Sequence, residues 1–223
     1  MDLSIFEKIL TLKSRSIPLV VDENTALECI TKFLRIQILS LDECRTWNYE
    51  NLYLYEKEED KTLISVKVVR DWISDLSEKP YTGKNLYILR NFDESTPQAM
   101  NASLKALEEP PSYAIILLVV KNPEELLETI RSRTIRLFSR YGSSPLGIEI
   151  ENAIEKFLAW KQESLIEIIQ NSKLDEETTF LILIELLKKA TKEYSNRIEQ
   201  CIEDLLEVHE NPRNILDRAI LYL

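Results

Sequence analysis

The sequence predicts an α/β domain with a parallel sheet and flanking helices, followed by a domain made only of helices. In the first part, short apolar runs alternate with helical patterns, and the longest run, 114–120, is apolar throughout, as in a parallel strand covered on both faces. After Leu137 the residues carry helical patterns almost continuously. We therefore expect an α/β domain at 1–140, a linker at 141–147 and a helical domain at 148–223.

The α/β domain should begin with a helix near residues 3–13 and then alternate between strands and helices. The expected strands are the apolar runs at 17–21, 52–55, 86–89, 114–120 and 135–138. The expected helices lie between them, at 24–39, 66–77, 97–108 and 123–131. Alternation of this kind is typical of a parallel sheet with helices on its faces.

Two of these helices begin with a clear signal. Thr96-Pro97 supplies a cap and a first helical residue whose missing N–H costs nothing, and Pro110-Pro111 ends that helix. Asn122-Pro123 repeats the signal, with Glu125 where a capping box places an acid. The second helix should turn its apolar residues inward, namely Leu126, Leu127 and Ile130.

The composition favours a globular protein, since 44% of the 223 residues are apolar. No apolar run approaches the roughly 20 residues that a membrane-spanning helix needs, and the first residues lack the charged start and cleavage site of a signal peptide. We expect a cytoplasmic location and no contact with a membrane. The formal net charge of −10 argues against a protein that binds DNA phosphates by itself.

Neither the cysteines nor the histidine predicts a metal site. Cys29, Cys44 and Cys201 are odd in number and far apart in the sequence, so they support neither a disulfide framework nor a zinc site. The single histidine, His209, lies in the last helical stretch and is interpreted as a surface or packing residue. We expect no metal and no cofactor.

The chain has only three glycines, and they exclude a phosphate-binding P-loop. Such a loop needs Gly-x-x-x-x-Gly-Lys-Ser/Thr, because glycine lets backbone N–H groups approach the phosphates. Gly142 and Gly147 have the right separation, but Ile148-Glu149 follows them; Gly83-Lys84 has no partner glycine. Where the loop should follow the first strand stands Asp22-Glu23, whose charge repels phosphate.

The stretch from Thr96 to Thr134 reads TPQAMNASLKALEEPPSYAIILLVVKNPEELLETIRSRT. It resembles a segment of bacterial DNA polymerase III clamp-loader subunits, which are AAA+ proteins, and above all of delta-prime. In that family a helix ending in Leu-Glu-Glu-Pro-Pro leads to a buried strand and then to a short helix closed by Ser-Arg-Cys. The arginine acts on a nucleotide held by the neighbouring subunit. Residues 64–70 extend the resemblance upstream, and residues 211–223 resemble the last helix of the family's collar domain.

The same resemblance covers the strand that ends in two magnesium-binding acids in related ATPases. Here that strand, 86–89, is followed by Arg90-Asn91, and an arginine cannot ligate a cation. Asp93 and Glu94 lie beyond the strand end and are interpreted as a solvated loop, with metal binding as the less favoured alternative.

The resemblance implies an AAA+-like sheet that lacks a P-loop, followed by a shortened, collar-like helical domain from which the family's lid is deleted. It implies a non-ATP-binding, delta-prime-like subunit that is no enzyme by itself and supports loading of the sliding clamp onto primed DNA as part of the DNA polymerase III holoenzyme. The implied partners are gamma/tau-like ATPase subunits and a delta-like subunit. The clamp and the primer-template DNA would be reached through the complex.

The resemblance also assigns a role to Arg133, as an arginine finger that acts in trans, with Ser132 and Thr134 as the supporting motif. Thr134 replaces the family's cysteine, so its hydroxyl needs a partner if it is buried. Without the resemblance, an arginine at a helix end is an ordinary solvated residue near the negative end of the dipole. Two alternatives stay open: an autonomous ATPase, which the missing P-loop disfavours, and a structural adaptor in which Arg133 is inert.

Overall fold

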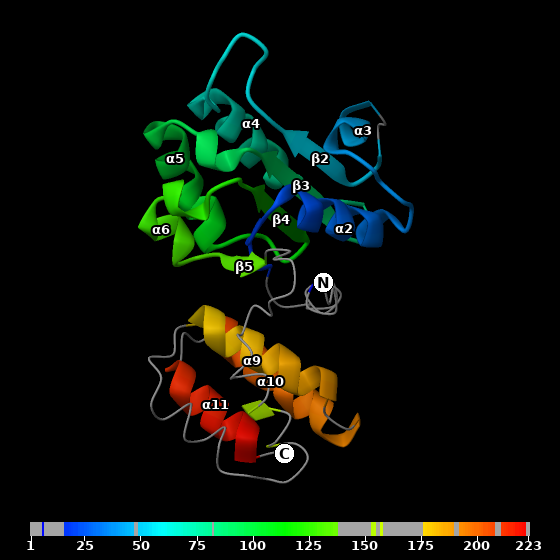
Figure 1. Ribbon diagram of the computed structural model, residues 1–223, viewed down its shortest axis with the longest axis vertical. Helices are drawn as coiled ribbons and strands as arrows, with labels where there is room; N and C mark the ends of the chain where they lie inside the picture. The colour runs from blue at the N-terminus through cyan, green and yellow to red at the C-terminus, as the bar shows by residue number, and fades with distance from the viewer. Residues whose placement is uncertain are drawn as a thin grey trace. The chain divides into compact units, whose positions relative to one another are not determined.

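The computed structural model describes residues 6, 16–46, 49–81, 83–137, 153–154, 157, 176–189, 192–207 and 211–221. The chain divides into two compact units, Met1–Ser139 and Arg140–Leu223, and each is considered by itself (Figure 1). The linker expected at 141–147 lies outside the described residues. So does the helix expected near 3–13, apart from the helical and buried Phe6.

The first unit contains a parallel sheet, which confirms the predicted fold class. Its strands are β1 (Leu19–Val21), β2 (Leu52–Tyr55), β3 (Asn85–Arg90), β4 (Ala114–Val119) and β5 (Ile135–Leu137). They lie in the order β2-β3-β4-β1-β5, and each neighbouring pair is parallel. The carboxyl ends of β1, β3 and β4 therefore meet at one edge of the sheet.

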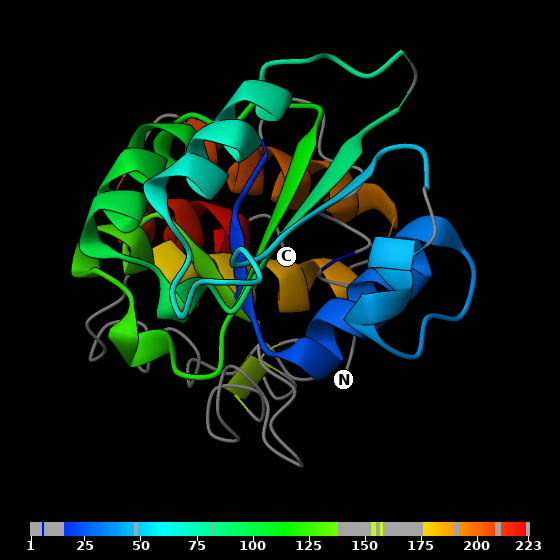
Figure 2. The same ribbon diagram turned by 90° about the horizontal axis from the view of Figure 1, so that it is seen from above.

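Helices cover both faces of this sheet, as predicted. One face carries α4 (Val66–Leu76), α5 (Pro97–Glu108) and α6 (Glu128–Arg131), and the other carries α2 (Glu23–Leu34) and α3 (Leu41–Thr46) (Figures 1 and 2). This arrangement explains the long apolar run: every residue of β4 is buried, since both of its faces are covered.

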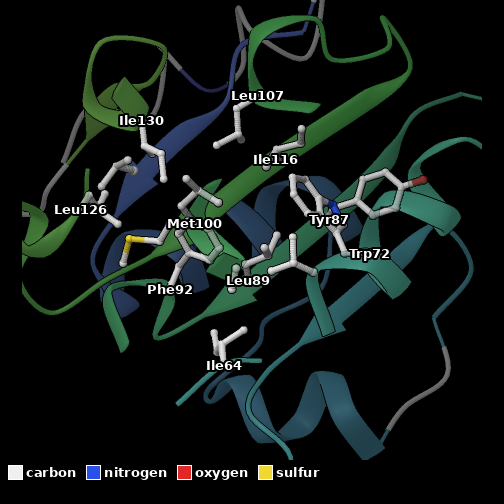
Figure 3. Packing of buried hydrophobic residues seen from close by; sticks show 14 of the residues in the cluster. Ile64, Trp72, Tyr87, Leu89, Phe92, Met100, Leu107, Ile116, Leu126 and Ile130 are labelled. Atoms are coloured by element: carbon white, nitrogen blue, oxygen red, sulfur yellow. The ribbon is translucent and has the colours of Figure 1, made fainter. Parts of the chain in front are cut away.

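A large apolar cluster lies between the sheet and the layer of α4, α5 and α6. Figure 3 shows Trp72, Tyr87, Leu89, Phe92 and Met100 directed toward one another, and each is at most 5% exposed. Phe92 lies in a single 3-10 turn, η1 (Phe92–Glu94), directly after β3. Burial of Phe92 thus fixes the backbone at the end of β3, where Arg90, Asp93 and Glu94 lie.

The helix predicted at 24–39 ends earlier, at Leu34. Arg35 adopts a left-handed conformation (φ 59°, ψ 28°), which breaks the helical hydrogen-bond ladder. The loop that follows is held by a hydrogen bond from the Ile38 N–H to Thr31 Oγ1 at 3.2 Å. A separate helix, α3, then begins at Leu41. No glycine or proline announces this break, and the sequence did not predict α3.

The helix predicted at 123–131 is also wrong as a continuous element. A 3-10 turn, η2 (Pro123–Glu125), is followed by Leu126 and Leu127 in extended conformation (ψ 144° and 140°) and then by α6. Leu126 and Ile130 are buried in the apolar cluster, whereas Leu127 is only partly buried. The extended pair lets both buried side chains reach the cluster from a short segment (Figure 3).

The described part of the second unit is helical, as predicted. It contains α9 (Glu176–Lys189), α10 (Lys192–Glu207) and α11 (Pro212–Leu221), and each of the three contacts the other two. An ion pair joins Arg218 Nη2 of α11 to Asp204 Oδ2 of α10 at 2.6 Å. No described helix in either unit is both long and apolar enough to cross a membrane.

Apolar residues that recur at helical spacing form a stripe on α9 and another on α11, and both contribute to the core of the second unit. Phe180, Leu181 and Leu187 are buried, and the side chain of Ile184 lies outside the description. On α11, the buried members of the stripe are Ile215, Leu216 and Ala219, whereas Ile220 is half-buried and Leu223 is not described.

Candidate functional site

The chain passes from β1 into α2 through one residue, Asp22. Its Oδ1 accepts the N–H of Thr25 at 2.7 Å, so this side chain caps the helix. In a parallel α/β sheet, ligands bind at the carboxyl ends of the strands, and phosphates bind the free N–H groups at a helix start. Here a carboxylate of the protein itself occupies that helix start, and no loop is long enough to surround a phosphate.

Arg90, at the carboxyl end of β3, lies among three acids from three different elements. Its Nη1 is 2.6 Å from Asp42 Oδ1 and 3.6 Å from Glu56 Oε2, and its Nη2 is 3.2 Å from Glu23 Oε1. The Arg90 side chain is only 21% exposed. We call Arg90, Glu23, Asp42 and Glu56 the Arg90 cluster. It joins the start of α2, α3 and the segment after β2 through one guanidinium.

Asp93 and Glu94 lie near the surface in the 3-10 turn η1 instead of a loop, and both form bonds that the sequence did not predict. Asp93 Oδ2 accepts the backbone N–H groups of Lys121 and Asn122, each at 2.9 Å. Glu94 binds Lys121 Nζ at 2.6 Å and lies 3.8 Å from Lys57 Nζ. The bond from Lys121 lowers the pKa of Glu94. Both acids thus hold the segment that follows β4. Among the described residues, no group of three or more metal-binding side chains could hold a metal ion.

Arg133 follows α6 after one residue, between the exposed Ser132 and the buried Thr134. Its Nη1 donates to the backbone oxygen of Thr129 at 2.8 Å, and its Nη2 is 3.5 Å from Glu108 Oε1. Its side chain is 32% exposed. The guanidinium therefore lies along its own helix and reaches the end of α5, with about a third of the side chain open to a second molecule.

The hydroxyl groups beside Arg133 both have partners. Thr134 Oγ1 donates to the backbone oxygen of Ile130 at 3.0 Å, which resolves the question raised by a threonine in place of cysteine. Ser132 Oγ donates to the backbone oxygen of Thr129 at 3.2 Å. These bonds and the burial of Ile130 give Arg133 a fixed base.

Further charged residues brace the segment around Arg133. Asn122 Oδ1 accepts the N–H of Glu124 at 3.1 Å, which caps η2 as predicted. The Glu124 carboxylate pairs with Arg131 and, at 3.1 Å, with Arg136 Nη1. Sequence reasoning missed Glu124 and Asp93 because their partners lie in other elements. Glu108 could have been found from the sequence, because it lies just before Pro110-Pro111, which fix the end of α5.

Cys29, Cys44 and Cys201 are buried free thiols. Burial raises the pKa of Cys29 to about 12, which keeps its thiol protonated and inert. His209 lies outside the described residues.

Comparisons with known proteins show similarity to subunits of DNA polymerase III. A family model described as DNA polymerase III, delta subunit, matches residues 37–139. The DNA polymerase III subunit delta' of Yersinia pestis is 38% identical over 87 residues, which cover 39% of this chain and 26% of that protein. The delta' subunit of Buchnera aphidicola is 26% identical over 172 residues, which cover 68% of this chain and 48% of that protein.

A solved structure of a DNA polymerase III gamma subunit-related protein from Thermotoga maritima aligns over 98% of this chain and 96% of that one, with 17% identity and a TM-score of 0.47. The chain spans less than half the length of the two delta' subunits described above. The family match and the delta' relatives confirm the resemblance indicated by the sequence between residues 96 and 134.

Proposed function

We propose that this delta-prime-like protein of the DNA polymerase III clamp-loader family supports loading of the sliding clamp onto primed DNA without binding ATP itself. Its chemical contribution is made in trans, by Arg133, at a nucleotide held by a neighbouring gamma/tau-like ATPase subunit. The observation that carries the proposal is the position of Arg133: it follows a helix end with a buried base, and its guanidinium is partly open to a second molecule.

The strand ends of the sheet support the absence of ATP binding. The start of α2 is capped by Asp22, and a triphosphate placed there would meet this carboxylate and that of Glu23. At the end of β3, the position of a magnesium-binding acid holds Arg90, whose guanidinium already pairs with three acids. A magnesium ion placed there would therefore find no free set of ligands, since all three acids already bind Arg90.

An arginine supplied by a neighbour can accelerate phosphoryl transfer by stabilising the charge that develops on the γ-phosphate. In related NTPases such a residue contributes about 10³–10⁵ in rate. Its planar fork binds two phosphate oxygens at once, which a lysine ammonium cannot do. In this chain Arg133 would leave its contact with Glu108, 3.5 Å away, for the phosphate. The carbonyl of Thr129 holds it near the surface until then.

The helical unit, residues 148–223 in our proposal, acts as the collar that joins this chain to its partners. The buried faces of α9, α10 and α11 form a core of their own, so the unit provides a stable platform for subunit contacts. The proposed partners are the ATPase subunits and a delta-like subunit. The clamp and the primer-template DNA are reached through the complex, in keeping with the net charge of −10.

The second candidate is a structural adaptor with an inert AAA+-like core. The ion pair of Arg133 with Glu108 favours it, because a guanidinium already paired within the chain has less need of a phosphate. An exposed pair of this kind typically contributes only about 0–1 kcal/mol, so it yields readily to a polyanion. We therefore prefer the trans-acting role.

Arg133→Ala in the assembled complex separates these two functions. The complex is built with gamma/tau-like and delta-like partners, and every ATPase site except the one facing this chain is inactivated. We expect normal assembly, a change in stability of no more than about 0.5 kcal/mol, and clamp- and DNA-stimulated hydrolysis lower by about 10³-fold. Arg133→Lys should restore little of this rate.

The matched control is Arg70→Ala, which removes an exposed arginine from α4 and should leave hydrolysis unchanged. Equal hydrolysis rates for the native complex and a correctly assembled Arg133→Ala complex would identify the chain as an adaptor.

A further inference from the structure

We infer that Asp93 is a positioning residue for Arg133. Its carboxylate holds the start of the segment that ends in Ser132-Arg133, although it is about forty residues away in the sequence. This inference rests on the proposed function, and it adds a residue that neither the resemblance nor the sequence pattern singled out for this role.

Asp93 is itself held firmly. It lies in η1 between the buried Phe92 and Glu94, whose N–H donates to the backbone oxygen of Asn91 at 2.9 Å. The oxygen of Glu94 accepts the N–H of Ile64 at 2.9 Å, which ties the same turn to the start of α4. The carboxylate therefore projects from a rigid turn at the end of β3.

From this turn, Asp93 Oδ2 accepts two consecutive backbone N–H groups, those of Lys121 and Asn122, both at 2.9 Å. Hydrogen bonds to an ionised carboxylate are among the stronger ones in proteins. Two of them on one oxygen fix the direction in which the chain leaves β4. The other oxygen, Oδ1, is buried and accepts no hydrogen bond from the described residues, so the two amides set the position of this carboxylate.

Bonds within the segment after Asn122 connect this fixed backbone to the residues around Arg133. Asn122 Oδ1 caps η2 through the N–H of Glu124 at 3.1 Å. The carboxylate of Glu124 then pairs with Arg131 and with Arg136, the arginines on either side of Arg133. A shift of the backbone at Asn122 would move Glu124 and, through its ion pairs, Arg131 and Arg136, which lie two residues before and three residues after Arg133.

Loss of Asp93 should therefore affect the rate of the chemical step more than assembly. Electrostatic stabilisation of a transition state depends on charges that are already in place, and a misplacement of about 1 Å can lower the rate by about 10²-fold. Substrate affinity at the facing site depends on the ATPase subunit itself. We expect kcat to fall for Asp93→Ala while KM for ATP stays unchanged.

The test measures hydrolysis at the facing site in the complete complex for Asp93→Ala, Asp93→Asn, Arg133→Ala and the double variant. Asp93→Ala should lower kcat by about 10- to 100-fold with unchanged KM. Asp93→Asn keeps an acceptor oxygen and should retain most of the activity. The double variant should be no slower than Arg133→Ala alone, because both changes act through one guanidinium. Asp71→Ala, at an exposed position on α4, is the matched control.

Amide hydrogen exchange on the full chain gives a readout that is independent of activity. Asp93→Ala should speed exchange at Lys121, at Asn122 and across residues 128–134, whereas Asp71→Ala should not. If Asp93→Ala does not fold, Asn122→Ala breaks the same path one residue later and should give the same loss of kcat.

Unchanged kcat in a folded Asp93→Ala or Asn122→Ala complex, with Arg133→Ala slow, would overturn this inference and leave the proposed function intact. Unchanged kcat in Arg133→Ala as well would overturn both. A double variant that is clearly slower than Arg133→Ala would also contradict the inference, because Asp93 would then act through something other than Arg133.

Discussion

Two regions of the first unit, the ends of β1 and β3 and the segment from Asn122 to Thr134, differ in how their charged side chains are bonded. At the carboxyl ends of β1 and β3, Asp22 and the Arg90 cluster bond to the protein itself, and we propose for this reason that neither a phosphate nor a metal ion binds there. In the segment from Asn122 to Thr134, similar bonds hold the backbone, and the guanidinium of Arg133 stays partly exposed. A nucleotide site needs a loop, backbone amides and a metal together, so it is lost by a few substitutions. A trans-acting arginine needs only a fixed base.

The largest expected effect is the loss of assembly when the second unit is removed. Both of the regions compared above lie in the first unit and remain in such a fragment. A fragment that ends at Ser139 contains the whole sheet and its apolar cluster, so it should keep its α/β fold. It should nevertheless fail to enter the complex, because we assign the subunit contacts to the helical unit. Circular dichroism checks the fold, and size-exclusion chromatography with the partner subunits checks assembly. Co-elution of the fragment with the partners would show that the collar assignment is wrong.

Arg90→Ala should separate the two regions from each other. It leaves Glu23, Asp42 and Glu56 without their shared cation, and the half-buried position of the guanidinium suggests a loss of about 1–2 kcal/mol of unfolding free energy. Hydrolysis by the assembled complex should stay unchanged, in contrast to Arg133→Ala.

Urea denaturation measures the stability of Arg90→Ala. Arg70→Ala is its control, since Arg70 is exposed on α4 and its loss should cost about 0.5 kcal/mol or less. A loss of hydrolysis for Arg90→Ala in an intact complex would mean that the two regions are coupled.

The smallest expected effect concerns Glu94, which lies between the two regions and binds Lys121. That bond lowers the pKa of Glu94 below its usual value of 4.5. A carboxyl group whose pKa is lowered by folding stabilises the protein above the unfolded pKa, and this contribution is lost as the pH falls through the folded pKa. Glu94→Gln should therefore be less stable than the native chain at pH 6–7, by about 0.5 kcal/mol or less, because the pair is largely solvated.

The difference between Glu94→Gln and the native chain should shrink as the pH falls below about 4.5. Thermal unfolding of both proteins between pH 7 and pH 4 measures it. A difference that grows toward acid pH would have the wrong sign for a lowered pKa.

Local sequence signals predicted the parts of the fold that depend on local chemistry. Thr96-Pro97 and Pro110-Pro111 bound α5 as observed, since capping and proline geometry act within a few residues. The break at Arg35 was missed because a left-handed arginine has no sequence signature. The break at Leu126 was missed because helical spacing also fits a turn followed by two extended residues.

In the candidate site, too, the sequence predicted the local features and missed contacts between residues far apart in the chain. Ser132, Arg133 and the loss of the P-loop could be read from residue order, because these motifs are contiguous. The pairings of Arg90 with Asp42 and of Asp93 with Asn122 join residues 48 and 29 positions apart, and only the strand order brings them together. No periodicity in one sequence encodes such a contact.

Isothermal titration calorimetry of the isolated 223-residue chain with Mg-ATP is the most direct test of whether the strand ends exclude a nucleotide. In our proposal, Asp22 at the start of α2 and the Arg90 cluster at the end of β3 occupy the positions that a phosphate and a magnesium ion would need. We predict no heat of binding at millimolar nucleotide, with or without magnesium. A saturable binding curve with a dissociation constant in the micromolar range would contradict the account, because the nucleotide site would then be functional in this chain.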